Sequence, residues 1–230
     1  MGLPLIVHAT GLREAKVALR AGAHMLVHSV MDLPVDDEFI RLMKSSGALY
    51  CPTLTVIDGY GRMYASARGS GPPRVDDSGG AVDSLTLARI STTPQAGAQH
   101  VPKSSNADPK VQAERDRVMA LNLKRVRAAG IPIAMGTDAG NPLTLHGPAV
   151  FGEMETMARD GMSPMEVLVA ATRNGARAMG RDDLGTVSTG MQADLLVLEA
   201  NPLKQVSNWR RIRCVIRSGV VRNREELRVR

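Results

Sequence analysis

The chain has 230 residues, of which 43% are hydrophobic and 23% charged, a composition typical of a globular protein with one sizeable core. No run approaches the roughly 18 apolar residues of a membrane-spanning helix, and the first residues lack the basic start of a signal peptide. We therefore expect no membrane partner, and the compartment stays open, with the cytoplasm as default. We expect Cys51 and Cys214 to be reduced thiols rather than a bridge.

The net charge of +6 resides in the C-terminal tail. From Trp209 onward the chain has eight arginines and two glutamates, so positive and negative charges cancel over the preceding residues. Apolar residues alternate with these arginines, which indicates half-exposed strands, and aromatic residues make up only 3% of the chain. We therefore expect no nucleic-acid partner. The alternative, an anion-binding tail, predicts strongly salt-dependent binding.

The first half of the chain alternates strands with helices. Short apolar runs predict strands over 4–10, 24–30 and 48–57, and Pro52 makes the third strand irregular or places it at its sheet's end. The intervening residues predict a helix that stops near Gly22 and a helix that Asp36 caps and Gly47 ends.

Residues 58–109 are rich in Gly, Ser, Pro and Thr, which predicts a long irregular loop with one short helix near 82–90. Order is expected to resume with a helix over 111–129, a strand over 131–136 and a helix over 152–159. Ser163, Pro164 and Glu166 then form a capping box for a helix that ends at 174–175, and a helical turn follows at 176–179.

The last part of the chain returns to strand patterns, at 185–187, 193–199 and twice within 209–221. We therefore divide the chain into an α/β part, residues 1–182, and a small β part, residues 183–230. Alternating strands and helices imply parallel strands joined by crossover helices.

Three polar residues stand where predicted parallel strands end: His8, His28 and Asp138. The carboxyl ends of parallel strands build the active site in α/β barrels, and neighbouring strands lie only about 4.8 Å apart. Two imidazoles and a carboxylate are a usual ligand set for Zn²⁺ and similar ions. Taken singly, each histidine is better explained as an ordinary hydrogen-bonded strand residue, and the joint pattern favours a metal site.

These stretches resemble the amidohydrolase superfamily, near its imidazolonepropionase-like and Xaa-Pro dipeptidase-like members. The resemblance is carried by LIVHATGLREAKVALRAGAHMLVHSV, by IPIAMGTDAGNPLTLHGPAVFGEMETMARDGMSPMEVLVAATRNGARAMG and by LGTVSTGMQADLLVLEANPL. It implies the carboxy-terminal half of a TIM-type (β/α)8 barrel, strands 5–8, plus part of a small β-sandwich. It also implies a divalent metal, Zn²⁺ by preference, and hydrolysis of amide, cyclic amide or dipeptide bonds.

The resemblance also implies roles for individual residues. His8 and His28 match the metal ligands of the fifth and sixth strands, and Asp138 matches the eighth-strand carboxylate that binds metal and transfers the proton. His146 matches a position at the mouth of such sites, where it either touches substrate or orders its loop. Tyr50, with Thr53, is a candidate to line the pocket. We expect His24 not to bind metal and His100 to be exposed.

The chain departs from the family pattern in one respect. It has no His-x-His pair, which the family carries on its first strand, and it begins at what would be the fifth strand. We therefore expect its partner to be a missing amino-terminal half or a second copy of the chain. The alternative to a hydrolase is a non-catalytic fragment or assembly module of a split amidohydrolase.

Overall fold

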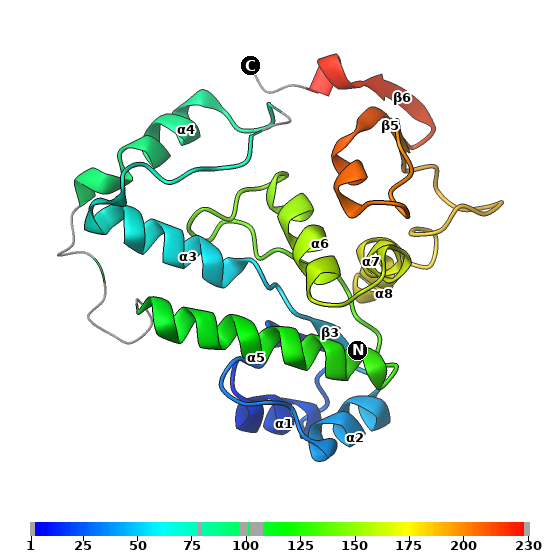
Figure 1. Cartoon of the computed structure of the whole chain (residues 1–230). Coiled ribbons are helices and arrows are strands. Elements are labelled where there is room, and N and C mark those ends of the chain that lie inside the picture. The colour runs from blue at the N-terminus through cyan, green and yellow to red at the C-terminus, as the bar shows by residue number, and fades with distance from the viewer. Residues whose placement is uncertain (1–2, 78–79, 97–100, 102–107, 228–230) are drawn as a thin grey trace.

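The computed structural model describes residues 3–77, 80–96, 101 and 108–227. Its elements alternate between strand and helix in the first part of the chain, continue as helices, and end in strands (Figure 1). The β-strands are β1 (Ile6–His8), β2 (Met25–Val27), β3 (Leu49–Cys51), β4 (Leu195–Leu198), β5 (Ile212–Arg217) and β6 (Val220–Asn223). The α-helices are α1 (Leu12–Arg20), α2 (Asp37–Ser46), α3 (Val56–Ala65), α4 (Ser84–Ser91), α5 (Pro109–Ala128), α6 (Ala149–Arg159), α7 (Pro164–Ala171) and α8 (Arg173–Ala178).

The described residues form two small sheets of three strands each. β1, β2 and β3 pair in that order and are parallel, as the alternating pattern predicted, whereas β4, β5 and β6 form an antiparallel sheet. In Figure 1 the helices α6, α7 and α8 lie between the two sheets. The fold is thus mixed α/β. The second sheet contains the strands expected within 193–199 and 209–221, whereas the strand predicted at 185–187 does not form, and these residues are irregular.

The strands of the parallel sheet are shorter than predicted. Each strand has three residues, although the hydrogen-bonded contact between β2 and β3 continues from His28 N to Cys51 O and from Ser29 N to Pro52 O, both at 2.9 Å. Pro52 can accept but not donate, which fits the expected irregularity. The predicted strand over 131–136 is reduced to an isolated parallel bridge between Tyr50 and Ile133.

One face of the parallel sheet forms the main core. The register places Val7, Leu26 and Tyr50 side by side, and Leu26 and Tyr50 are fully buried there. The Phe39 ring of α2 packs against Tyr50, with centroids 6.3 Å apart. The fully buried Asn122 of α5 accepts a hydrogen bond from Val35 N and donates to the carbonyls of Val30 and Leu33, which ties this helix to the loop before α2.

Local capping signals were confirmed where the sequence predicted them. Asp36 accepts a hydrogen bond from Phe39 N, Gly47 ends α2 with φ of 65°, and Ser163 forms a capping box with Glu166. The helix after Ser163 stops earlier than predicted, because the backbone breaks at Thr172 and restarts as α8.

The prediction of an irregular loop over residues 58–109 was wrong at its start. Helix α3 covers Val56–Ala65, a π-helical turn follows over Ser66–Ser70, and 3-10 turns occur at Thr93–Ala96, Val206–Arg210 and Arg224–Leu227. The expected short helix is present as α4, and the predicted position of His100 lies outside the described residues. Gly59 and Gly61 lower helix propensity in α3, so tertiary packing must overcome the local preference.

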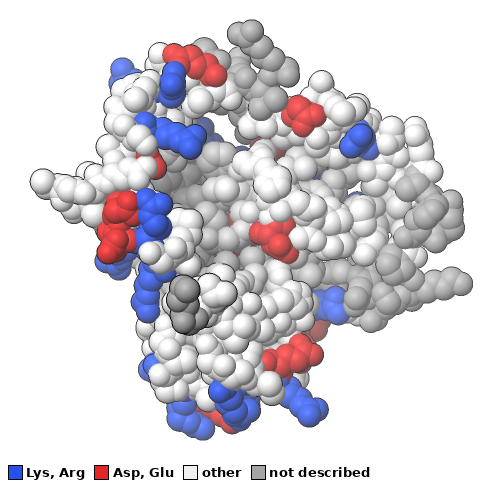
Figure 2. Space-filling model, turned by 180° about the vertical axis from the view of Figure 1, so that it is seen from behind, with Lys and Arg blue, Asp and Glu red and all other residues white. Residues whose placement is uncertain are grey.

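Both cysteines are free thiols, with Cys51 buried. Across the described residues, no helix is both long enough and apolar enough to cross a bilayer. Three arginines of the tail form ion pairs with acidic residues of the same chain: Arg210 with Glu155 and Asp76, Arg211 with Glu199, and Arg222 with Glu226. On the face shown in Figure 2, basic and acidic side chains lie beside one another. The expected absence of a nucleic-acid partner stays a prediction.

Candidate functional site

The side chains of His8 and His28 meet at the carboxyl ends of β1 and β2. His8 is the last residue of β1 and pairs in register with Val27, so His28 follows directly beside it. The two rings make an edge-to-face contact, with centroids 4.4 Å apart and planes inclined by 71°. His28 is buried and His8 is exposed, so the pair has one shielded ring and one open to solvent.

The two nitrogens of His28 have different neighbours. Nδ1 lies 2.6 Å from Thr53 Oγ1, just beyond β3, and Nε2 lies 3.8 Å from Asp138 Oδ2. Burial, with a smaller contribution from His8, lowers the pKa of His28 below its usual 6.5, while Asp138 opposes this shift. The ring is therefore neutral near pH 7. In the tautomer that donates the Nδ1 proton to Thr53 Oγ1, the Nε2 lone pair faces Asp138.

Asp138 reaches the site from the segment that follows the bridge at Ile133. Tyr50 N donates to Pro132 O and Ala134 N donates to Tyr50 O, each at 3.0 Å, which places this segment beside β3 in parallel. Asp138 has φ of 53°, and its carboxylate accepts a hydrogen bond of 2.8 Å from Asn141 Nδ2. The carboxylate is part exposed, so it is open to solvent or substrate.

The donor chemistry of His8, His28 and Asp138 fits a divalent metal. The 3.8 Å between His28 Nε2 and Asp138 Oδ2 exceeds a hydrogen bond. It matches the roughly 3–4 Å expected between two ligand atoms that each lie about 2 Å from one Zn²⁺. The arrangement is open, however: in the described part of the chain no group of three or more His, Cys, Asp or Glu side chains is arranged as a metal site. The role of these three residues as metal ligands therefore stays a prediction.

The two other predicted site residues lie in different surroundings. Tyr50 is fully buried, its hydroxyl lies 2.7 Å from Ser29 Oγ and accepts from Val30 N, and burial raises its pKa to about 12. The structure thus places Tyr50 in the core, with its hydroxyl on the residue that follows His28, and its contact with substrate stays a prediction. His146 is exposed, and a Cβ added to Gly140 would lie 3.8 Å from its Nε2, so His146 borders the loop that carries Asp138. Its contact with substrate stays a prediction.

Sequence reasoning missed Glu153, a fully buried glutamate in α6. Its carboxylate accepts hydrogen bonds from Leu54 N at 2.8 Å, Thr55 N at 3.0 Å and Thr55 Oγ1 at 2.9 Å. Burial raises its pKa to about 7, against the effect of these three donors. Glu153 therefore fixes the backbone immediately after Thr53, the residue that contacts His28. The sequence signal that could have identified Glu153 was its position as a charged residue next to Met154, on the apolar side of the helix predicted over residues 152–159.

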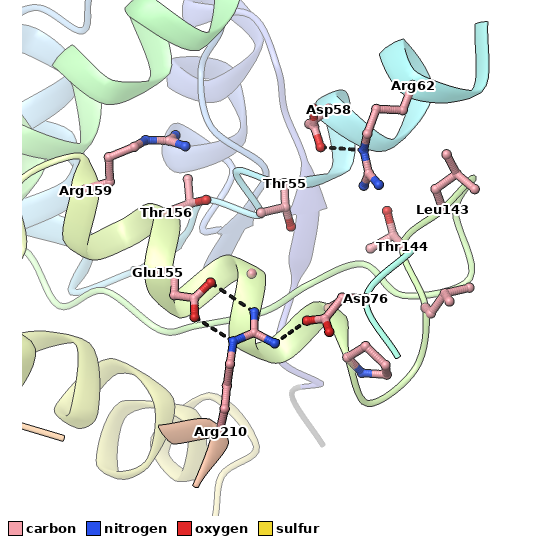
Figure 3. Close-up of a pocket in the computed structure, with 14 residues that line it drawn as sticks. Thr55, Asp58, Arg62, Asp76, Leu143, Thr144, Glu155, Thr156, Arg159 and Arg210 are labelled. Carbon is pink, nitrogen blue, oxygen red and sulfur yellow. Dashed lines mark hydrogen bonds and ion pairs between the residues drawn. The ribbon is translucent and has the colours of Figure 1, made fainter. Parts of the chain in front are cut away.

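A separate cavity of about 470 Å³ lies between α3, α6 and the loop before α6 (Figure 3). Arg210 reaches across its wall and binds Glu155 through two hydrogen bonds, at 2.7 and 3.0 Å, and also pairs with Asp76. Arg62 pairs with Asp58 at 2.8 Å. His8, His28 and Asp138 do not line this cavity. Its charged side chains already have partners of opposite sign, so it offers no evident reactive group.

Comparison with known proteins relates the chain to one family. The model of the amidohydrolase family matches residues 1–222. An ochratoxinase from Aspergillus niger is 27% identical over 201 residues, which span 86% of this chain and 33% of that protein. An imidazolonepropionase from Syntrophobacter fumaroxidans is 29% identical over 196 residues, spanning 74% of this chain and 44% of the relative.

Solved structures agree in fold. A Xaa-Pro dipeptidase with methionine bound in its active site superposes with a TM-score of 0.65 at 22% identity, over 96% of this chain and 45% of that one. The crystal structure of A. niger ochratoxinase gives a TM-score of 0.65 at 24% identity, over 96% and 42% of the respective chains. The present chain thus spans less than half the length of these relatives.

Proposed function

Because the chain belongs to the amidohydrolase family, we propose that it forms the carboxy-terminal part of a metal-dependent hydrolase that cleaves carbon–nitrogen bonds. The substrates would be small amides, cyclic amides or dipeptides. The observations that support the proposal are the ring contact of His8 with His28 and the 3.8 Å between His28 Nε2 and Asp138 Oδ2, at the carboxyl ends of parallel segments. Family members generally use divalent metals, and we propose Zn²⁺ here.

His8 and His28 would hold the metal through their imidazoles, and Asp138 through its carboxylate. A bound divalent metal would polarise the substrate carbonyl and lower the pKa of a water molecule to near 7. Thr53 fixes the ring of His28 through Nδ1 and leaves Nε2 free to bind. The Asp138 carboxylate, which is part exposed, would take the proton of the attacking water and deliver it to the leaving nitrogen.

We further propose that the parallel segments are strands 5–8 of a TIM-type barrel. The order β1, β2, β3 and then the Ile133 segment supports this arrangement, since each segment is parallel to its neighbour. The sheet face opposite the core exposes Ile6 to 51%, and β1 is the edge strand. An amino-terminal half or a second copy of the chain would cover this face and supply the remaining ligands. The antiparallel sheet would be part of a small β-sandwich.

The test is metal content and turnover of the purified chain, alone and with any amino-terminal half supplied. We expect a stoichiometric divalent metal and hydrolysis of Xaa-Pro dipeptides or cyclic amides that stops on chelation. Asp138→Asn should abolish turnover, whereas Asp182→Asn, which changes an exposed carboxylate, should leave it intact. Turnover indifferent to both chelator and Asp138→Asn would refute the proposal. Assembly without metal or turnover would instead favour a non-catalytic module.

A further inference from the structure

We propose that Tyr60 and Asn141 are positioning residues that hold the Asp138 carboxylate toward the metal ligand His28. This inference rests on the proposed function, because it assigns the residues that orient its central carboxylate. Tyr60 comes from α3, Asn141 from the loop after Asp138, and neither belongs to the predicted ligand set.

Asn141 binds the same carboxylate oxygen that faces His28. Its Nδ2 donates to Asp138 Oδ2 at 2.8 Å and to the Asp138 carbonyl oxygen at 3.0 Å. Asp138 Oδ2 is also the atom that lies 3.8 Å from His28 Nε2. One amide group therefore fixes both the backbone and the side chain of Asp138, and so fixes the direction in which Oδ2 points.

Tyr60 determines the orientation of the Asn141 side-chain amide. The Tyr60 hydroxyl donates to Asn141 Oδ1 at 2.8 Å. With the oxygen held by this donor, the NH₂ group faces Asp138. The reverse orientation would set Oδ1 against the carboxylate and the NH₂ group against the phenol, and would lose the hydrogen bonds to Asp138. Tyr60 therefore acts on Asp138 through Asn141.

Helix α3 is packed closely enough to serve as a fixed support for Tyr60. A Cβ at Gly59 would lie 2.3 Å from Pro142 O and 3.0 Å from Thr144 Oγ1, so the helix backbone touches the loop that carries Asn141. The backbone just before α3 is also held in place, because the Glu153 carboxylate accepts hydrogen bonds from Leu54 N and Thr55 N. The close approach and the buried anchor set the Tyr60–Asn141 contact by packing as well as by the hydrogen bond.

The experiment measures zinc affinity by competition with a chromophoric chelator, for the full chain and for Tyr60→Phe, Asn141→Ala and the double variant. Tyr64→Phe is the matched control, because it removes the same hydroxyl one turn further along α3, where the Tyr64 ring lies 6.1 Å from that of Tyr60. Tyr60 and Asn141 are only half-buried, so the variants are expected to fold. Urea unfolding of the metal-free proteins checks this.

We expect Asn141→Ala to weaken zinc binding about tenfold, as losses of residues that orient a metal ligand do. Tyr60→Phe should weaken it less, and the double variant should match Asn141→Ala alone, because Tyr60 has no other route to Asp138. Tyr64→Phe should bind as the original chain does. If the two residues had a purely structural role, the variants would shift the urea unfolding midpoints, and the losses of zinc affinity would add in the double variant.

The outcomes separate this inference from the proposed function. Unchanged affinity in Tyr60→Phe and Asn141→Ala, with zinc bound by the original chain, overturns the positioning role alone. Additive losses in the double variant also overturn it, since the two residues would then act independently. Failure of the original chain to bind zinc under any condition overturns both proposals together.

Discussion

Replacement of Glu153 by glutamine should remove a pH-dependent part of the folding free energy. The Glu153 side chain is fully buried, and burial raises its pKa from 4.5 to about 7. The folded state therefore holds the proton more tightly than the unfolded state. The stability contributed by the protonated carboxyl is complete below about pH 4.5 and is lost as the pH rises through 7. At about 1.4 kcal/mol per pH unit of difference, the loss between pH 5 and pH 8 is about 2–3 kcal/mol.

Urea unfolding of the original chain and of Glu153→Gln at pH 5, 6, 7 and 8 tests this reasoning. The glutamine side chain of the variant does not titrate, and the other ionisable groups contribute similarly to both proteins. The difference in unfolding free energy, original minus variant, should therefore fall by about 2–3 kcal/mol over this range. A difference that stays flat, or that rises with pH, would refute it. The donors at Leu54 N, Thr55 N and Thr55 Oγ1 would then outweigh burial and keep the carboxylate ionised throughout.

Three further outcomes follow from the same structure. In urea unfolding, Gly59→Ala should lower the unfolding free energy by roughly 1–3 kcal/mol, because the added Cβ meets Pro142 O. Gly61→Ala should leave it unchanged or raise it by about 0.5–1 kcal/mol, because a Cβ there has nothing within 4 Å. Equal effects of the two substitutions would contradict the close packing of Gly59. Thr53→Val should weaken zinc binding about tenfold by removing the partner of His28 Nδ1, and unchanged affinity would show that the ring needs no such support. Iodoacetamide at pH 8 should label Cys214 before Cys51, because Cys51 is buried and burial raises the pKa of its thiol to about 12. Mass spectrometry measures the order of labelling, and Cys51 labelled first in the native chain would disprove this.

Features with a local cause were predictable from sequence. The N-cap at Asp36, the left-handed Gly47 and the capping box at Ser163 each depend on hydrogen bonds between residues within a few positions of one another. The presence and parallel direction of β1 and β2 were also predictable from short apolar runs, although the predicted ends at residues 10 and 30 lie beyond the observed ends at His8 and Val27. This is why His8 and His28 were identified without knowledge of the tertiary structure.

Features with a distant cause were not predictable. The sequence of α3 contains Gly59 and Gly61, and its neighbours are rich in loop-forming residues, so local propensity favours a loop. The helix forms where Gly59 can touch Pro142, a residue more than eighty positions away, and where Glu153 binds the backbone of residues 54 and 55. The Tyr60–Asn141 contact has the same long range, which explains why neither residue was a candidate.

Backbone conformation supports the proposed site, because residues with positive φ lie close together there. His28, Thr53 and Asp138 all have positive φ, at 74°, 45° and 53°, as do Leu143 and Ser218 elsewhere in the described residues. Residues other than glycine rarely adopt this region, although His and Asp do so more often than Thr. Such conformations cost on the order of 1–3 kcal/mol each and persist only where surrounding contacts impose them. Here the contacts are visible: Thr53 binds His28, and Asn141 binds Asp138. Glycine, as at Gly47 at the end of α2, would adopt this backbone conformation without the strain. Imidazole, hydroxyl and carboxylate groups held near one another by strained backbone therefore support the proposed site.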